Sequence, residues 1–314
     1  MQTIFAHRAC GILYRFISRY TGCYLLPANV CPVVPLTFKL ANVAFEFVDI
    51  NERTLCVDED VCLSLLKKQK CNGLVFVHTY GTDYNPQCFF GQIKNIDQNF
   101  RIVDDKCLCS PDLMAPQTIS DLTLYSTGYA KYVDLGEGAF GYLQDGLGLS
   151  CEQVLYNGVD IEPYYKTAFL NNKKMNEIVE GWLDTTISIV PDEKYISGIC
   201  EKKAEICKRK ARINEIYTEV LRDVKTLGDE FNQWRYNILV NDKEKILNLI
   251  FDNGMFASSH YQPSSRLFVG EKYPNAEKLY DHVINLFNDN YMDLESARKL
   301  AISIQNFESK MKQM

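Results

Sequence analysis

The sequence lacks long apolar runs, an excess of basic residues and internal repeats. No apolar segment approaches the roughly 18 residues that a membrane-spanning helix needs, and the N-terminus lacks a signal-peptide cleavage pattern. The formal net charge of −6 argues against a nucleic-acid groove as the main function. No repeat or low-complexity tract is present. These absences predict a soluble protein that binds neither a membrane nor a nucleic acid polymer.

Histidine is scarce, and cysteine lacks the spacing of a metal site. Twelve cysteines lie singly within apolar segments, and Cys107 and Cys109 form the one close pair. There is no CxxC motif, and the four histidines are scattered. Zinc sites are built from closely spaced cysteine and histidine ligands, so we expect no metal. The cysteines are interpreted as reduced thiols of a cytoplasmic protein.

The pattern of apolar segments changes near residue 145. Before it, short apolar strands alternate with helices or loops, and runs such as 73–78 are typical of buried parallel strands. This pattern predicts a mostly parallel α/β sheet, in a large domain over residues 1–190. Residues 191–314 are predicted to form a smaller α+β domain. Its expected elements are a long helix near 199–224, a strand at 234–240, and helices at 243–252, 275–288 and 293–310.

Ligands of parallel α/β sheets bind beyond the carboxyl ends of the strands, so polar residues at those ends are candidate site residues. Here these residues are Asp49, His78, Asp104, Asp105 and Ser126. We interpret His78 as structural, because a histidine that ends an apolar strand is more often a satisfied buried residue than a catalyst.

Lys131 stands between a strand end and a glycine-containing turn. A lysine held rigidly in a desolvated site can present a free amine for Schiff-base chemistry. Taken singly, Lys131 also fits a solvated loop, Asp105 a strand-end cap and Ser126 an ordinary turn. Their order and spacing carry more information: Ser126 follows Asp105 by 21 residues, and Lys131 follows Ser126 by five.

This arrangement resembles the PLP-dependent, fold-type-I sugar aminotransferases of the DegT type. That family has a strand ending in Glu-Asp, then Ser-x-x-x-x-Lys, then Glu-Gly-Gly six residues after the lysine. The corresponding segments here are Asp104-Asp105, Ser126 to Lys131, and Glu137-Gly138-Ala139. The segments FEFVDI (45–50), VHTYG (77–81) and 256–261 resemble further family elements, in the same order.

The resemblance implies the fold of a fold-type-I PLP enzyme, with a mostly parallel, seven-stranded type of sheet and a smaller α+β domain. Lys131 would be the Schiff-base lysine and would move the proton at the substrate carbon. Asp105 would pair with the pyridinium nitrogen. The cofactor phosphate would be bound by Ser126 and, from the other side, by backbone amides near Arg8 and Ala9.

The activity that the resemblance implies is transfer of an amino group, from glutamate, to a keto-sugar that is linked to a nucleotide. The product would be an amino sugar for polysaccharide biosynthesis, and the protein would be a homodimer. His260 and Tyr261, in the segment that turns back toward the active site, could contact the substrate.

Three positions depart from the family pattern. His7-Arg8 replaces a small pair at the first phosphate-binding turn, Cys31 replaces a stacking aromatic residue, and Leu108 replaces a histidine or glutamine. These departures leave open a catalytically degenerate homologue that binds a sugar nucleotide. A PLP-dependent dehydratase of the same fold is a further alternative, but that variant usually has histidine in place of Lys131.

Overall fold

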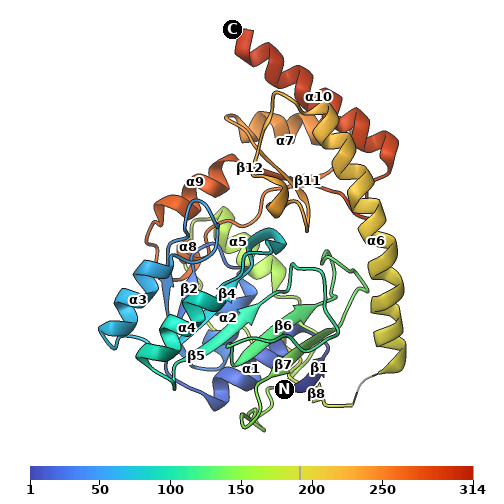
Figure 1. Cartoon of the computed structure of the whole chain (residues 1–314). Helices are drawn as coiled ribbons and strands as arrows, with labels where there is room; N and C mark the ends of the chain where they lie inside the picture. The colour runs from blue at the N-terminus through green and yellow to red at the C-terminus, as the bar shows by residue number, and fades with distance from the viewer. Residues whose placement is uncertain (191, 314) are drawn as a thin grey trace.

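The computed structural model describes residues 1–190 and 192–313, which form a large α/β part beneath a smaller sheet with helices (Figure 1). The strands of the described residues form a large sheet with the order β3-β2-β4-β5-β6-β7-β1-β8. Its strands are β1 (Gln2–Ala6), β2 (Cys23–Pro27), β3 (Ala44–Val48), β4 (Gly73–Val77), β5 (Arg101–Asp105), β6 (Leu122–Ser126), β7 (Ala139–Leu143) and β8 (Ile187–Ser188).

The large sheet is mostly parallel, as the sequence predicted. β3, β2, β4, β5 and β6 are parallel neighbours. β7 is antiparallel to both β6 and β1, so β1 points in the same direction as β6. The two-residue strand β8 extends the expected seven-stranded type of sheet at its edge, where it pairs with β1.

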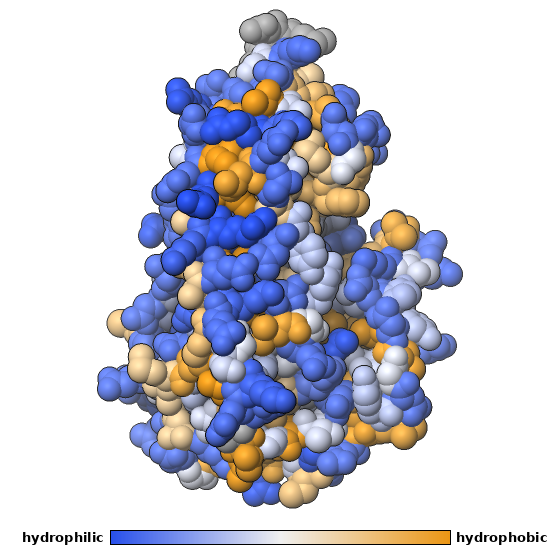
Figure 2. All heavy atoms as spheres, turned by 90° about the vertical axis from the view of Figure 1, so that its right-hand side faces the viewer, coloured by the Kyte–Doolittle hydropathy of each residue, from blue (hydrophilic) through white to orange (hydrophobic). Residues whose placement is uncertain are grey.

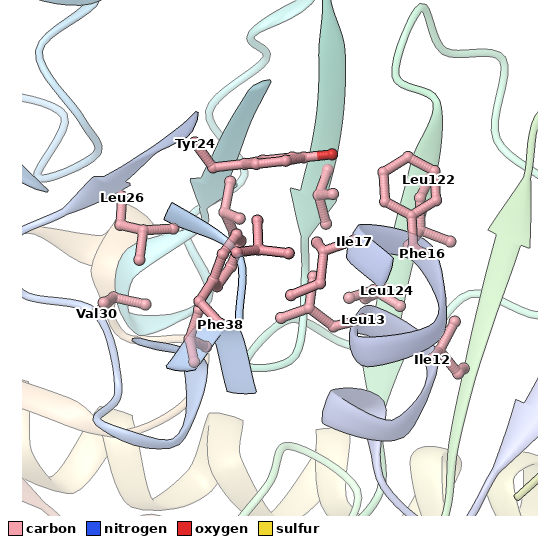
Figure 3. Close-up of a cluster of buried hydrophobic side chains, with 14 of the residues drawn as sticks. Ile12, Leu13, Phe16, Ile17, Tyr24, Leu26, Val30, Phe38, Leu122 and Leu124 are labelled. Carbon is pink, nitrogen blue, oxygen red and sulfur yellow. The ribbon is translucent and has the colours of Figure 1, made fainter. Parts of the chain in front are cut away.

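Helices and short turns connect these strands. They are α1 (Ala9–Arg19), α2 (Val33–Leu40), α3 (Glu59–Lys67), η1 (Thr79–Gly81), α4 (Gln87–Ile96) and α5 (Glu162–Leu170). The buried face of α1 carries Ile12, Leu13, Phe16 and Ile17, which lie in one apolar cluster with residues of β2, α2 and β6 (Figure 3). Burial of each of these side chains stabilises the fold by roughly 1.5–3 kcal/mol. This packing fixes the start of α1 beside the sheet.

A long helix and a four-stranded sheet form the C-terminal part. The sheet has the order β11-β12-β10-β9. The elements are α6 (Glu193–Val220), β9 (Lys225–Thr226), η2 (Asp229–Phe231), β10 (Tyr236–Leu239), α7 (Lys243–Asp252), β11 (Ala257–Ser258), α8 (Ser265–Phe268), α9 (Pro274–His282), β12 (Val283–Leu286) and α10 (Leu294–Gln313).

The helix α6 runs alongside the large part and reaches the smaller sheet (Figure 1). Its buried residues are Ile199, Ile206, Lys210, Ile213 and Tyr217. The side of the molecule on which α6 lies is mainly hydrophilic, with separate hydrophobic patches (Figure 2). The predicted domain boundary between residues 190 and 191 involves a residue outside those described, and it stays a prediction.

Several elements differ from the sequence-based expectation, and two of these differences change the sheets. The strand β1 was not expected, and it lies between β7 and β8. The helix predicted over residues 275–288 ends at His282, and Val283–Leu286 continues as β12 between β10 and β11. A four-residue segment with three apolar residues fits helix and strand equally well, and here the hydrogen bonds to two neighbouring strands decide its structure.

Within residues 1–190 and 192–313, no helix is both long and apolar enough to cross a membrane. The twelve cysteines all lie in this described part, and each is a free thiol. No group of three or more His, Cys, Asp or Glu side chains in the same residues could hold a metal ion.

Candidate functional site

The carboxyl ends of several parallel strands meet at one edge of the large sheet. Asp105, the last residue of β5, pairs in register with Val77, the last residue of β4. Ala139 of β7 pairs with both Ser126 at the end of β6 and Ala6 at the end of β1. Asp105, Ser126 and the start of α1 therefore lie along the same edge, where such sheets bind ligands.

Asp105 offers a buried carboxylate at this edge. Its side chain is 8% exposed, and Oδ1 accepts a hydrogen bond from the backbone N–H of Cys107 at 2.9 Å. Its own backbone carbonyl accepts from His78 N at 3.0 Å. Among the described residues the carboxylate forms no ion pair, so it can interact with one more cationic donor.

The neighbouring carboxylate of Asp104 is engaged within the fold. Asp104 Oδ1 lies 2.8 Å from His78 Nε2, and the other ring nitrogen of His78 lies 3.0 Å from the carbonyl oxygen of Thr82. Both side chains are almost fully buried. The interactions at both ring nitrogens agree with the structural interpretation of His78.

The loop after β6 holds Lys131 in a fixed position. Ala130, directly before it, has φ 58°, in the left-handed region that a non-glycine residue seldom adopts. Ala130 N donates to Asp134 Oδ2 at 2.8 Å, and Ala130 O accepts from Trp234 Nε1 at 2.6 Å. Lys131 is partly buried, and its Nζ has no hydrogen bond or ion pair within the described residues. The backbone is thus anchored while the amine is left available.

Three buried thiols, those of Cys10, Cys31 and Cys107, are influenced by the charges of both Lys131 and Asp105. Burial raises the pKa of Cys10 to about 12, and it also raises the pKa of Cys31 and Cys107. On each thiol, the charge of Asp105 raises the pKa further and the charge of Lys131 opposes the shift. Since both charges act on the same three thiols, Lys131 and Asp105 both lie near this group of thiols, which are neutral at ordinary pH.

His260 and Tyr261 belong to the C-terminal part and are influenced by charges of the same region. Burial is the main reason that the pKa of His260 falls to about 3, and the cations Arg235, Lys166 and Lys131 lower it further. Burial raises the pKa of Tyr261 well above its ordinary value, and nearby Cys31 and Asp105 add to that shift. His260 therefore lies within the electrostatic range of Lys131, with its imidazole neutral, and Tyr261 within that of Asp105. That these two residues contact a substrate stays a prediction.

Ser126 and the N-terminus of α1 lie at the same sheet edge. The Ser126 Oγ accepts a hydrogen bond from Gly128 N at 3.4 Å. In the first turn of α1, Gly11 N donates to the carbonyl oxygen of Arg8 at 2.9 Å, whereas the amides of Ala9 and Cys10 have no partner within the helix and no side chain caps them. The side chain of Arg8 is exposed, so Arg8 and Ala9 contribute through the backbone. A helix N-terminus and a hydroxyl at one sheet edge suit a phosphate group.

Sequence reasoning missed an aromatic stack beside the lysine loop. The Trp234 ring is nearly parallel to the rings of Tyr80, at a centroid distance of 6.3 Å, and Tyr261, at 6.4 Å. The Tyr80 hydroxyl donates to the carbonyl of His260. The one local signal was Trp234 itself, because the chain has two tryptophans. The contacts join residues far apart in sequence, and no local pattern indicates them.

Lys210 of α6 forms a hydrogen bond to the backbone of Trp234. Its Nζ donates to the carbonyl oxygen of Trp234 at 2.6 Å and to Asn288 Oδ1 at 2.7 Å. The residue is 4% exposed, and burial lowers its pKa to about 7. The charge of Arg235 lowers this pKa as well, whereas that of Asp289 opposes the shift.

The substitution Lys210→Met is expected to change how stability depends on pH. The folded-state pKa of Lys210 lies below its ordinary value of 10.5, so the unfolded chain binds more protons between about pH 7 and 10.5. The wild type should therefore gain stability over the variant as pH rises, by up to about 3 kcal/mol between pH 7 and 9.5. Urea unfolding at both pH values measures this gain. Lys208→Met, at an exposed position of the same helix, is the control, and an equal gain there would contradict the prediction.

No protein-family model matches the chain, and no curated protein matches it. Several solved structures do. Sugar aminotransferase CalS13 from Micromonospora echinospora matches with a TM-score of 0.72 at 16% identity, over 97% of this chain and 87% of that chain. Spr1654 from Streptococcus pneumoniae in its PLP form gives 0.73 at 14%, over 98% and 87%. A DegT/DnrJ/EryC1/StrS aminotransferase from Brucella abortus gives 0.66 at 15%, over 97% and 85%. At these identities the likeness establishes the fold: the mixed α/β architecture is that of these aminotransferases.

Proposed function

We propose that the protein is a PLP-dependent aminotransferase that transfers an amino group from glutamate to a keto-sugar linked to a nucleotide. The observation that carries this proposal is that Asp105, Ser126 and the start of α1 lie at one edge of the large sheet, with Lys131 in the loop that follows β6. The sugar substrate is supported by the fold shared with CalS13. We place the protein in the cytoplasm, as a homodimer, in amino-sugar and polysaccharide biosynthesis.

The residues present fit the cofactor. PLP carries an aldehyde that reacts with amines, a ring nitrogen that can be protonated, and a phosphate. The sheet edge and the loop after β6 offer a free lysine amine in Lys131, a buried carboxylate in Asp105, and a helix N-terminus with the Ser126 hydroxyl for the phosphate. Cys31 lies near Lys131 and Asp105 but cannot stack on a ring, so the site lacks the stacking residue of the family pattern.

Each of these residues has a defined task. When bound, PLP supplies an electron sink for the bond that breaks at the substrate carbon. Asp105 would hold a proton at the ring nitrogen, because a buried carboxylate stabilises a neighbouring cation. The Lys131 amine would accept the proton from the donor carbon and return it during the second half of the reaction. The hydrogen bond of Trp234 to Ala130 would keep that amine in place.

A catalytically degenerate homologue that binds a sugar nucleotide is the second candidate. Leu108 supports it, because this side chain is buried in an apolar cluster with Tyr80 and Trp234 and offers no polar group to the pocket. Lys131 argues against a dehydratase.

Reduction with borohydride tests the proposal. The protein is purified with PLP, its visible absorbance is recorded, and the reduced sample is digested for peptide mass spectrometry. We expect a visible band and a covalent label on Lys131, and glutamate should bleach the band before reduction. A folded protein without the label would leave only the binding homologue. A label without bleaching would point to another donor or reaction.

A further inference from the structure

A cavity of about 550 Å³ lies where the large part meets the C-terminal part. Its lining comes from the loop after β3, from β9 and β10 with the residues beside them, and from the helices α9 and α10. Among the described residues that line it, none is Asp105, Ser126 or Lys131, so the cavity is separate from the proposed reaction centre. Small-molecule sites commonly occupy cavities of roughly 300–1,000 Å³ at such junctions.

One wall of the cavity is aliphatic. Ile50, Leu55 and Leu279 line it and are almost fully buried, and Leu239 lines it and is partly buried. All four belong to a single apolar cluster. Burial of apolar surface is favourable by about 25 cal/mol per Å², so this wall would stabilise an apolar group placed against it.

Leu55 has an unusual backbone conformation at this wall. Its φ is 56°, in the left-handed region that a bulky side chain rarely adopts. Leu55 N donates to the carbonyl oxygen of Asn51 at 2.8 Å, and Leu55 O accepts from Thr79 Oγ1 at 2.7 Å. Such conformations persist only where the surroundings fix them, and they recur at ligand sites. The loop after β3 is therefore held so that Leu55 lines the cavity.

Most charged or titratable side chains at the cavity are already engaged. Glu52 forms an ion pair with Lys278 at 2.9 Å. Asp223 Oδ2 accepts from Gln305 Nε2 at 2.8 Å, a contact that brings α10 against the segment before β9. Nδ1 of His282 lies 2.7 Å from the carbonyl oxygen of Lys278, to which it donates.

Lys225 and Glu308 are the two opposite charges of the lining that remain. Lys225 belongs to β9, and Glu308 lies one turn after Gln305 on the same side of α10. Within residues 1–190 and 192–313, neither side chain forms a hydrogen bond or an ion pair, so the two charges do not neutralise each other. An opposite pair held apart beside an apolar wall is complementary to a zwitterion that carries an apolar group.

We propose that this cavity binds a free α-amino acid with a large apolar side chain. Lys225 binds its carboxylate, Glu308 binds its ammonium group, and the side chain packs against Leu55 and Leu279. Each charge of the ligand thus meets an opposite charge that the protein leaves unpaired. The aliphatic wall shares its cluster with Trp234, whose indole donates to the carbonyl before Lys131, so packed side chains connect the cavity with the lysine loop.

Calorimetric titration with L-phenylalanine and with L-leucine, on protein without added PLP, tests the proposal. We expect Lys225→Gln and Glu308→Gln each to weaken binding at least tenfold. Neither substitution removes a contact within the described residues, so both variants should fold. Lys272→Gln and Glu295→Gln change exposed charges that do not line the cavity, and they should bind like the wild type. Lys131→Ala should bind like the wild type as well.

Two analogues of L-phenylalanine test whether both charges of the ligand are recognised. 3-Phenylpropanoate lacks the ammonium group, and 2-phenylethylamine lacks the carboxylate. Each should bind at least tenfold more weakly than L-phenylalanine. If 3-phenylpropanoate binds as tightly, the cavity recognises an apolar anion, and the assignment is overturned.

Three further results would also overturn the proposal. In the first, the wild type binds neither amino acid. In the second, Lys225→Gln and Glu308→Gln both bind as the wild type does. In the third, Lys131→Ala abolishes binding and Lys225→Gln does not, because the amino acid would then occupy the proposed reaction centre. The titration uses no PLP, so a failure of the proposed aminotransferase function would leave its result unchanged.

Discussion

Lys131→Ala is expected to abolish both the visible PLP band and turnover, while the protein stays folded. The Lys131 Nζ forms no hydrogen bond or ion pair within the described residues, so its loss removes no stabilising contact. Substitutions of this kind usually change stability by less than about 0.5 kcal/mol. Loss of a general base alone lowers rates by roughly 10²–10⁴-fold, and loss of the nucleophile adds to this. Single-turnover assays and absorbance measure the two signals, and urea unfolding measures stability.

A second lysine beside the same loop gives a matched control. Lys202 of α6 and Lys131 both line a cavity of about 100 Å³ next to the loop. Lys202→Ala changes the charge by the same amount at nearly the same place, but it leaves the proposed amine intact. It should retain the band and most of the turnover. Equal losses in both variants would show that local charge, and not the Lys131 amine, is responsible.

The position of Asp105 and Ser126 at one sheet edge could be predicted because its information is local. Asp105 and Ser126 end apolar strands, and Lys131 follows within five residues, so the parallel sheet itself brings them to one edge. The spacing of these residues along the chain thus encodes their proximity in space. The fold class followed from the same alternation of strands and connections.

The other half of the site could not be predicted in this way. Trp234 contacts Ala130 across 104 residues, and Tyr80 reaches His260 across 180. Such contacts depend on how the C-terminal part packs against the loop, which no periodicity records. The burial of Arg235 could not be predicted either, because an arginine directly before a strand is usually exposed. Its burial becomes visible only in the three-dimensional structure.

Asp105→Asn is expected to preserve the fold and PLP binding but to lower turnover by roughly 10²–10³-fold. The amide keeps an oxygen that can accept from Cys107 N, now at 2.9 Å, so the local structure should persist. It removes the negative charge that would keep the cofactor ring protonated. Loss of one member of a buried charge pair costs about 3–5 kcal/mol, and most of this cost would fall on the reacting state. Stopped-flow measurement of the glutamate half-reaction gives the rate.

The adjacent aspartate makes the test of Asp105 specific. Asp104→Asn alters the buried contact with His78 Nε2 at 2.8 Å, so it should lower stability by about 1.5–3 kcal/mol. The rate per folded molecule should remain near that of the wild type. The two substitutions thus have opposite expected effects, one on rate and the other on stability, although they differ by a single position in β5. If Asp104→Asn slowed the half-reaction and Asp105→Asn did not, the cofactor-facing carboxylate would be Asp104.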